Sequence, residues 1–226
     1  MRPVAAVPRW IVAILGLSVA AQVGWQVSRG AGSAADAELA PAPGAHVLRL
    51  ASFGEPEAAA RLAMVHLQSY RDPDYRRLIG WLESILELDP RSQYPLFSAA
   101  RVYAETSDAT SSRLALDFVQ RQFLRDPARR WPWLAHAALL AKHRLKDLPL
   151  ARRYAQALER HATAPGVPAW AQQMEIFILE DMNELEAAKI LIGSLLQSGA
   201  LHDPAELRFL KRKLEELEAR LAAGKR

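Results

Sequence analysis

Apolar residues recur at spacings of three and four along most of this chain, which is the period of an α-helix with one buried face. Within residues 75–88, for example, Leu78, Ile79, Leu82 and Ile85 follow this spacing. The alternating pattern and Gly-containing turns of β-hairpins are nearly absent from the same part of the chain. The pattern therefore predicts an all-α fold with nine helices, at about 56–70, 73–88, 93–105, 110–125, 131–143, 148–162, 168–181, 184–198 and 204–222.

Prolines separate the predicted helices at regular intervals, and several of these prolines follow an aspartate. Such Asp-Pro pairs occur at 72–73, 89–90, 126–127 and 203–204. An aspartate before a proline at the first helical position accepts hydrogen bonds from free amides and fixes the backbone for the helix. Several of these pairs are therefore predicted to begin helices.

Nearly constant helix lengths and short connections are typical of stacked helical hairpins. Residues 88–90 (Leu-Asp-Pro) have the form of a repeat end, and the Asp-Pro pair at 126–127 has the same form 37 residues later. In this register Tyr103, Ala115 and Trp133 fall at tyrosine, alanine and tryptophan positions of the tetratricopeptide repeat. The sequence over residues 55–200 thus resembles that family, in about four degenerate hairpins whose turn glycines are replaced.

The resemblance implies a right-handed solenoid of antiparallel helical hairpins, with a partner-binding groove lined by the first helix of each hairpin. The groove is then expected to hold Tyr94, Phe97, Arg101, Trp131, Leu134 and Lys142. An aromatic and cationic groove of this kind suits a peptide that carries apolar and acidic groups.

The chain begins with a different pattern. Residues 10–27 (WIVAILGLSVAAQVGWQV) carry no charged side chain, and a helix of this length spans roughly 27 Å, close to the thickness of a bilayer core. Arg2 and Arg9 precede this stretch. The positive-inside bias therefore predicts an anchor over residues 1–28, with the amino terminus cytoplasmic and the main domain in the periplasm, facing away from the inner membrane. A cleaved signal peptide is the alternative.

The segment after the anchor, residues 29–54, begins with small residues and is rich in glycine, alanine and proline. This composition predicts a flexible tether between the anchor and the helical repeats. At the other end of the chain, the segment 201–226 carries leucines at alternating spacings of three and four, namely Leu207, Leu210, Leu214, Leu217 and Leu221. This seam predicts a helix that caps the solenoid, and a dimerisation helix is the alternative.

The modest net charge of +4 conceals an uneven distribution. Residues 121–160 carry ten basic and three acidic side chains, whereas residues 161–210 carry two basic and seven acidic ones. One interpretation is an electropositive surface for an acidic partner or anionic lipid headgroups, and the other is a basic face paired with its acidic neighbour. The mild charge and the predicted location argue against nucleic acid. The proposed basic patch consists of Arg129, Arg130, Arg144, Lys146, Arg152 and Arg153.

Sequence signatures of catalysis are lacking. The chain has no cysteine, its six histidines are dispersed, and it contains no phosphate-binding or dinucleotide-binding glycine motif. We therefore expect no enzyme activity, no catalytic residue, no cofactor and no metal site. The predicted function is a membrane-anchored scaffold for protein–protein interaction or for assembly of a membrane or envelope complex. Two alternatives are a structural component that forms homo-oligomers through its last leucines, and an accessory subunit of an envelope-modifying enzyme.

Overall fold

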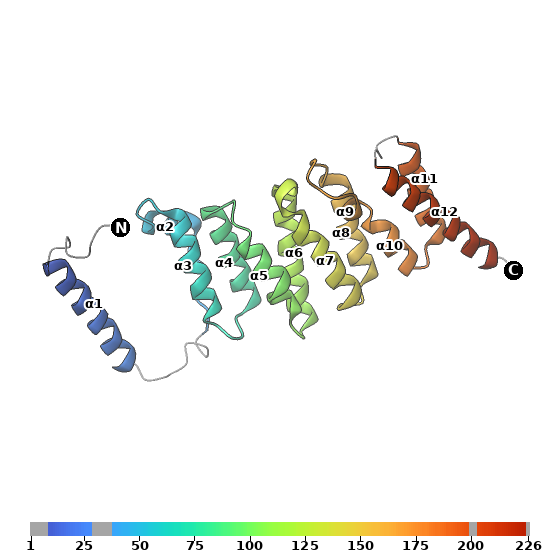
Figure 1. Ribbon diagram of the computed structural model, residues 1–226. Coiled ribbons are helices and arrows are strands. Elements are labelled where there is room, and N and C mark those ends of the chain that lie inside the picture. The colour runs from blue at the N-terminus through green and yellow to red at the C-terminus, as the bar shows by residue number, and fades with distance from the viewer. Residues whose placement is uncertain (1–8, 29–37, 199–202, 225–226) are drawn as a thin grey trace.

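The computed structural model of the 226-residue chain describes residues 9–28, 38–198 and 203–224. Within these ranges the fold is all-α, as predicted, and has no β-strand. The helices from α2 to α12 follow one another in chain order along a row (Figure 1). The helices are α1 (Arg9–Ser28), α2 (Ala45–Ala51), α3 (Pro56–Gln68), α4 (Tyr75–Leu88), α5 (Tyr94–Arg101), α6 (Ala109–Arg125), α7 (Pro127–His143), α8 (Leu148–His161), α9 (Ala169–Gln172), α10 (Met174–Asp181), α11 (Leu185–Gln197) and α12 (Pro204–Gly224), with a 3-10 turn, η3, at Tyr103–Glu105.

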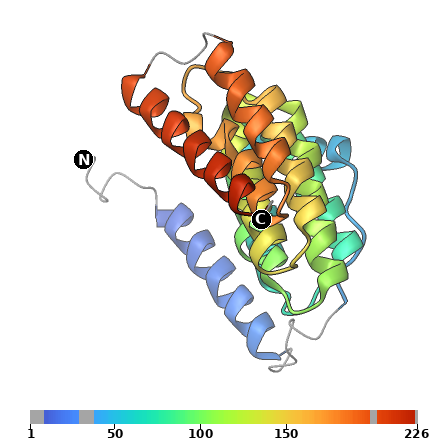
Figure 2. The ribbon, with the colours of Figure 1, turned by 90° about the vertical axis from the view of Figure 1, so that its right-hand side faces the viewer.

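Most helices pack on their neighbours in the sequence. Thus α3 packs on α4, α5 on α6, α7 on α8, and α11 on α12. Further contacts join helices that are two apart in the chain, namely α4 with α6, α5 with α7, and α8 with α10. Figure 2 looks down the row from the end at which α12 lies. Successive helix pairs therefore stack one after another.

A nearly constant offset in sequence relates side chains to their partners in the preceding helix pair. Tyr154 donates to Asp117, 37 residues earlier, and Arg121 donates to Glu83, 38 residues earlier. Arg144 donates to the carbonyl of Glu105 across 39 residues, and Arg130 and Trp133 reach back 40 residues to Pro90 and Gln93. Successive pairs of about this length thus pack in the same register.

Aspartates begin the second helix of three successive pairs. Asp74 accepts the amide of Arg77 at 3.0 Å at the start of α4, and Asp147 accepts the amide of Leu150 at 2.9 Å at the start of α8. Asp108 caps α6 in the same way and accepts the amides of Thr110 at 3.2 Å and Ser111 at 2.8 Å. Each cap satisfies amides that have no partner within the helix.

The Asp-Pro prediction is confirmed at two of its four positions, since Pro127 begins α7 and Pro204 begins α12. The pair at 89–90 behaves differently, because Asp89 ends α4 and accepts the amides of the next turn. At 72–73 the cap lies at Asp74, one residue beyond the proline.

The predicted helix boundaries differ most from the structure at three of the nine helices. The helix predicted at 93–105 ends at Arg101 as α5 and is followed by the η3 turn. The helix predicted at 131–143 begins at Pro127, and Pro132 lies inside it. The helix predicted at 168–181 is divided into α9 and α10 at Gln173. Proline at the first helical position loses no needed donor, so Pro127 can begin α7. Pro132 is the sixth residue of the helix and lacks the amide that would donate to the carbonyl of Ala128.

The apolar residues form two clusters that meet at α10. The main core extends from Leu39 to Ile178, and a smaller cluster lies between α10, α11 and α12. Met174 and Ile178 of α10 belong to the main core, whereas Ile176 and Leu179 belong to the smaller cluster. α10 thus connects the last two helices to the rest of the fold.

Small residues lie where the helices approach most closely. Ala115, Ala137 and Ala188, which the repeat register places at small positions, are each 0% exposed. Phe118 is also fully buried, and Trp133 packs against the same core. Alanine lets two helix backbones come close, and large neighbours then fill the remaining space.

Residues 38–51 do not form a flexible tether, contrary to the prediction for 29–54. Leu39 is buried in the main core, and three side chains of α4 donate to carbonyls of the segment. Arg77 donates to Leu39 at 2.8 Å, Trp81 to Ala40 at 2.9 Å, and Ser84 to Pro43 at 3.1 Å. The segment therefore lies along α4 and leads into α2, which also packs on α4. Residues 29–37 lie outside the described part of the chain.

Removing the indole donor of α4 should release this segment. In Trp81→Phe the ring keeps its place in the core, whereas the hydrogen bond to the Ala40 carbonyl is lost, at a cost of about 1 kcal/mol. We expect faster amide hydrogen exchange at residues 38–51, measured by mass spectrometry. Trp133→Phe is the matched control, since its indole donates to Gln93 instead. Unchanged exchange in Trp81→Phe would mean that the segment is held by other contacts.

Helix α1 covers most of the predicted anchor, of which residues 1–8 are outside the described ranges. Its apolar residues are spread around the helix rather than gathered on one face. Trp10, Ile14 and Leu17 are 64, 60 and 73% exposed. Among the described residues, no helix has both the length and the hydropathy of a membrane span.

The leucine seam of α12 packs within the chain. Leu210 and Leu217 are 0% exposed and belong to the small cluster with α10 and α11, and Leu214 packs against it. Ion pairs join the same elements, since Lys213 lies 3.0 Å and Arg220 3.6 Å from Glu180 of α10. α12 is therefore the last layer of the row. The predicted boundary near 200 falls on residues 199–202, which are not described.

Candidate functional site

Aromatic side chains from α5, α7 and α9 form a row in two groups of contacting rings, one on each side of α7. Tyr94 and Phe97, three residues apart on α5, are stacked with ring centroids 6.0 Å apart. Phe97 makes a T-shaped contact with Trp133 of α7 at 5.8 Å. Trp131 of α7 makes a similar contact with Trp170 of α9 at 5.6 Å. The row therefore crosses three helices that belong to successive pairs.

Trp131 and Trp133 lie on the two flanks of one side of α7. Because they are two residues apart, they project about 200° from each other around the helix, and Leu139 projects between them. Leu139 is 42% exposed. The side of α7 that faces solvent is thus bordered by α5 through Trp133 and by α9 through Trp131.

Several members of this row remain open to solvent. Tyr94, Phe97 and Trp170 are 45, 39 and 52% exposed, and Phe209 of α12 is 37% exposed. Phe209 contacts Phe177 of α10 with centroids 6.3 Å apart. Contiguous exposed apolar side chains are uncommon on soluble surfaces and mark interaction sites. We call this surface the aromatic face, defined by Tyr94, Phe97, Trp131, Trp133, Leu139, Trp170, Phe177 and Phe209.

The aromatic face contains a small apolar cleft of about 330 Å³ between α7, α9 and α10. Trp170 and Leu139 form its rim, and the Lys142 ammonium group ion-pairs with Asp181 of α10 at its edge. A cleft with apolar walls and one charged pair can accept an apolar side chain. The cleft is lined by Ala138, Leu139, Lys142, Trp170, Met174, Phe177 and Ile178.

Five of the six predicted groove residues lie at or near this surface. Tyr94, Phe97 and Arg101 are exposed, and Trp131 and Lys142 are partly exposed. The prediction is wrong for the sixth, Leu134, which is 0% exposed in the main core and cannot contact a partner.

The prediction missed Trp133, Leu139, Trp170, Phe177 and Phe209. A repeat register that continues past Pro149 would have found Trp170, which begins the next pair. The other residues depend on how each helix is rotated about its axis.

The charge of the aromatic face is set by a few groups beside α5. No hydrogen bond or ion pair of Arg101 is observed in the described part of the chain. Burial and then Arg101 lower the pKa of His136, whereas the Glu105 carboxylate, 3.9 Å from its Nε2, raises the pKa. His136 is therefore uncharged at neutral pH, and Arg101 supplies the free positive charge of this region.

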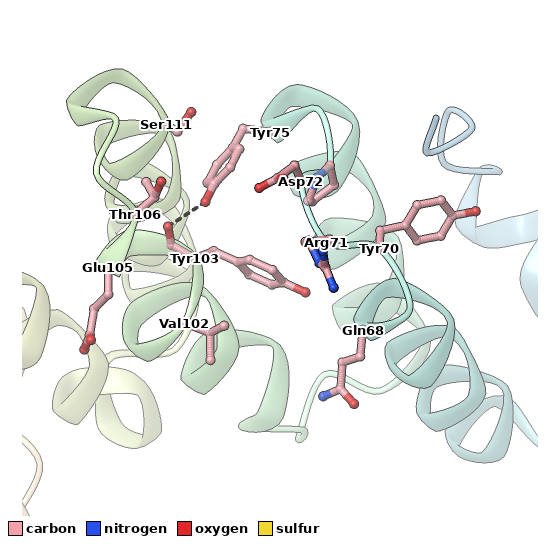
Figure 3. Close-up of a pocket in the computed structure, with 11 residues that line it drawn as sticks. Gln68, Tyr70, Arg71, Asp72, Tyr75, Val102, Tyr103, Glu105, Thr106 and Ser111 are labelled. Atoms are coloured by element: carbon pink, nitrogen blue, oxygen red, sulfur yellow. Dashed lines mark hydrogen bonds between the residues drawn. The ribbon is translucent and has the colours of Figure 1, made fainter. Parts of the chain in front are cut away.

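A second, more polar cavity of about 510 Å³ lies between the loop after α3 and the η3 turn (Figure 3). The Tyr75 hydroxyl donates to the Tyr103 carbonyl at 2.9 Å, and the two rings make a T-shaped contact. Burial raises the pKa of both phenols. Both therefore stay protonated at neutral pH and act as hydrogen-bonding groups rather than as nucleophiles.

The predicted basic patch is not one open surface. Arg130 is 4% exposed, and Arg129 pairs with Asp126. Arg144 donates to the carbonyls of the η3 turn, and Arg152 lies 2.9 Å from Glu175 of α10. Lys146 and Arg153 are exposed.

Acidic residues of α10 pair with two cations of the basic segment 121–160, as the second interpretation of the charges expects. Glu175 pairs with Arg152 and Asp181 with Lys142. Glu180 instead pairs with Lys213 and Arg220 of α12. The acidic residues of α10 thus form ion pairs with α7, α8 and α12. These pairs neutralise part of the positive charge that the sequence predicts for a partner-binding surface.

Among the described residues, no cluster of three or more histidine, aspartate or glutamate side chains is arranged to hold a metal ion. Comparison of the chain with protein-family models, curated proteins and solved structures finds no match. The structure therefore defines a class, an all-α protein of stacked helix pairs with an exposed aromatic face.

Proposed function

We propose that this chain is a non-catalytic scaffold that binds a protein partner on its aromatic face. The observation that carries this proposal is the exposure of that face, where Trp170 is 52%, Tyr94 45% and Phe97 39% exposed. Large aromatic side chains that contact one another and also face solvent contribute much of the binding energy at protein interfaces. The adjacent apolar cleft offers a place for an anchoring side chain.

The fold that we propose is a right-handed, tetratricopeptide-like solenoid. Its support is the offset of 37 to 40 residues between bonded partners in successive pairs, together with fully buried alanines at the repeat positions. In such a solenoid the first helices of the pairs line one surface, and here α5, α7 and α9 carry the aromatic face.

The partner that suits this surface is a peptide with apolar side chains and at least one acidic group. Apolar side chains would contact Trp170 and Phe97, and a carboxylate would meet the guanidinium group of Arg101. An extended or helical segment can place such groups at regular intervals along the face.

We further propose that the chain is a single-pass protein of the inner membrane, with its helix pairs in the periplasm. This part of the proposal rests on the uncharged residues 10–27 and the preceding Arg2 and Arg9. An integral protein stays in the membrane pellet after alkaline carbonate treatment. Release of the chain by carbonate would contradict the membrane anchor. It would not bear on partner binding by the aromatic face, which a separate experiment tests.

Site-specific photocrosslinking tests the proposed interface. A photoreactive amino acid is placed at Phe97 or at Trp170 in the full chain, and the membranes are irradiated before purification. We expect a discrete crosslinked partner band at both positions, identified by mass spectrometry. The matched controls are Leu124 on α6 and Ile190 on α11, which are 49 and 71% exposed but lie outside the aromatic face. Equal crosslinking at all four positions would rule out a specific interface on this face.

A further inference from the structure

A cationic cavity of about 410 Å³ lies where α6 ends and α7 begins, away from the residues of the aromatic face. Arg49 of α2 and residues of the α4 C-terminus complete its walls. Its volume is within the range of about 300–1,000 Å³ that is usual for small-molecule sites. Four arginines and two carboxylates line the cavity. The arginines are Arg49, Arg125, Arg129 and Arg130, and the carboxylates are those of Glu87 and Asp126.

Two buried side chains of this cavity have donors that lack acceptors. Arg130 is 4% and Gln122 1% exposed. The Arg130 Nη1 atom donates to Gln122, to the backbone carbonyl at 2.8 Å and to Oε1 at 3.0 Å, and Nη2 donates to the Pro90 carbonyl at 3.0 Å. Arg130 Nε and Gln122 Nε2 have no hydrogen-bond partner in the described residues. Buried donors are normally satisfied, and an unsatisfied one costs about 1–3 kcal/mol.

The positive charge around these donors is only partly balanced. Asp126 is engaged by Arg129, and Arg49 donates to the backbone carbonyl of Glu87 at 2.9 Å rather than to its carboxylate. No interaction of the Arg125 guanidinium group is observed in the described residues. Burial lowers the pKa of Arg130 and Asp126 raises it, while the positive charges of Arg129 and Arg125 lower it further. A bound anion would offset this repulsion.

We propose that this cavity binds a small oxyanion with the chemistry of a phosphate group. Guanidinium groups present planar pairs of N–H donors that match the oxygens of phosphate. The unprotonated oxygens of an oxyanion are also acceptors, and acceptors are what the unpaired donors in this cavity lack. Arg125 and Arg129 lie at its rim and would contact the ligand first.

The phosphate group could be free or could belong to a lipid headgroup, and two titrations separate these sources. The full chain in a non-ionic detergent is titrated by calorimetry with inorganic phosphate and, separately, with glycerol 1-phosphate as a soluble headgroup analogue. Sodium chloride at matched ionic strength is the reference. Saturable binding of inorganic phosphate alone assigns a free anion, and tighter binding of glycerol 1-phosphate assigns a headgroup. Heats equal to those of chloride for both ligands would overturn the proposal.

Variants of the rim test whether the binding occurs in this cavity. Arg125→Gln removes a cation that makes no observed contact within the described fold, and we expect it to weaken binding of the preferred ligand by roughly tenfold. Arg49→Gln is a second variant with the same expected direction. Arg153→Gln removes an exposed arginine on α8, outside the cavity, and should leave the dissociation constant unchanged. An equal loss in Arg153→Gln and Arg125→Gln, or no loss in either rim variant, would overturn the site.

Discussion

Replacing Leu134 with alanine should lower the free energy of unfolding by about 2–5 kcal/mol, without reducing partner crosslinking per folded molecule. Leu134 is 0% exposed in the main core, so the smaller side chain leaves a cavity among close-packed helices. Urea denaturation followed by circular dichroism measures the change. An unchanged free energy of unfolding would mean that Leu134 is not in the core. Leu134 would then lie in the partner-binding groove, as the repeat register expects.

Trp170→Ala is the complementary variant for this experiment. Its side chain is 52% exposed, and its main contact is with Trp131. We expect a loss of about 1 kcal/mol or less in stability, together with loss of the crosslink formed from Phe97 if the face acts as one surface. The two variants therefore separate a residue that maintains the fold from one that contacts a partner.

The second large effect is expected at α12. Leu217→Ala should destabilise the last two helices by about 2–5 kcal/mol, because Leu217 is 0% exposed in the small cluster with α11. This cluster is joined to the main core by α10, so we expect local opening rather than complete unfolding. Hydrogen exchange should increase in α11 and α12 and stay at the wild-type rate in α4 and α6. Glu215→Ala, an exposed change on the same helix, should leave exchange unchanged.

The same variant distinguishes a capping helix from a dimerisation helix. If α12 caps the row, light scattering of the detergent-solubilised chain gives the same molar mass for the wild type and for Leu217→Ala. If the leucines instead join two chains, the wild type is a dimer that Leu217→Ala dissociates, which would contradict the packing on α11. The burial of Leu210 and Leu217 within one chain favours the cap.

Helix positions and small residues could be predicted because their signals are local. Spacings of three and four, capping aspartates and prolines act within one or two turns of the chain. Pro127 begins α7 for this reason, and Ala115 and Ala188 are buried where the repeat register places them. The segment 38–44 could not be predicted, because its alanines and prolines resemble a linker. What holds it is the set of donors from Arg77, Trp81 and Ser84.

The candidate surfaces could be predicted only in part. The repeat register placed Tyr94 and Phe97 in the groove, and their rings stack on one side of the short helix α5. The repeat register placed Leu134 in the groove, but the exposed side of α7 lies between Trp131 and Trp133. That rotation of α7 is set by α6 and α8, which make most of its contacts, and by α5.

The sequence by itself determined that this chain forms helices in pairs, where most of them begin, and which small residues lie between them. These properties depend on backbone geometry and on neighbours within a few residues. Only the tertiary structure decided which side of each helix faces solvent. It also decided which cations are consumed in ion pairs and that Arg130 is enclosed with unpaired donors. These properties depend on partners about 40 residues away, as in the bond from Arg130 to Pro90, and a local pattern cannot specify such contacts.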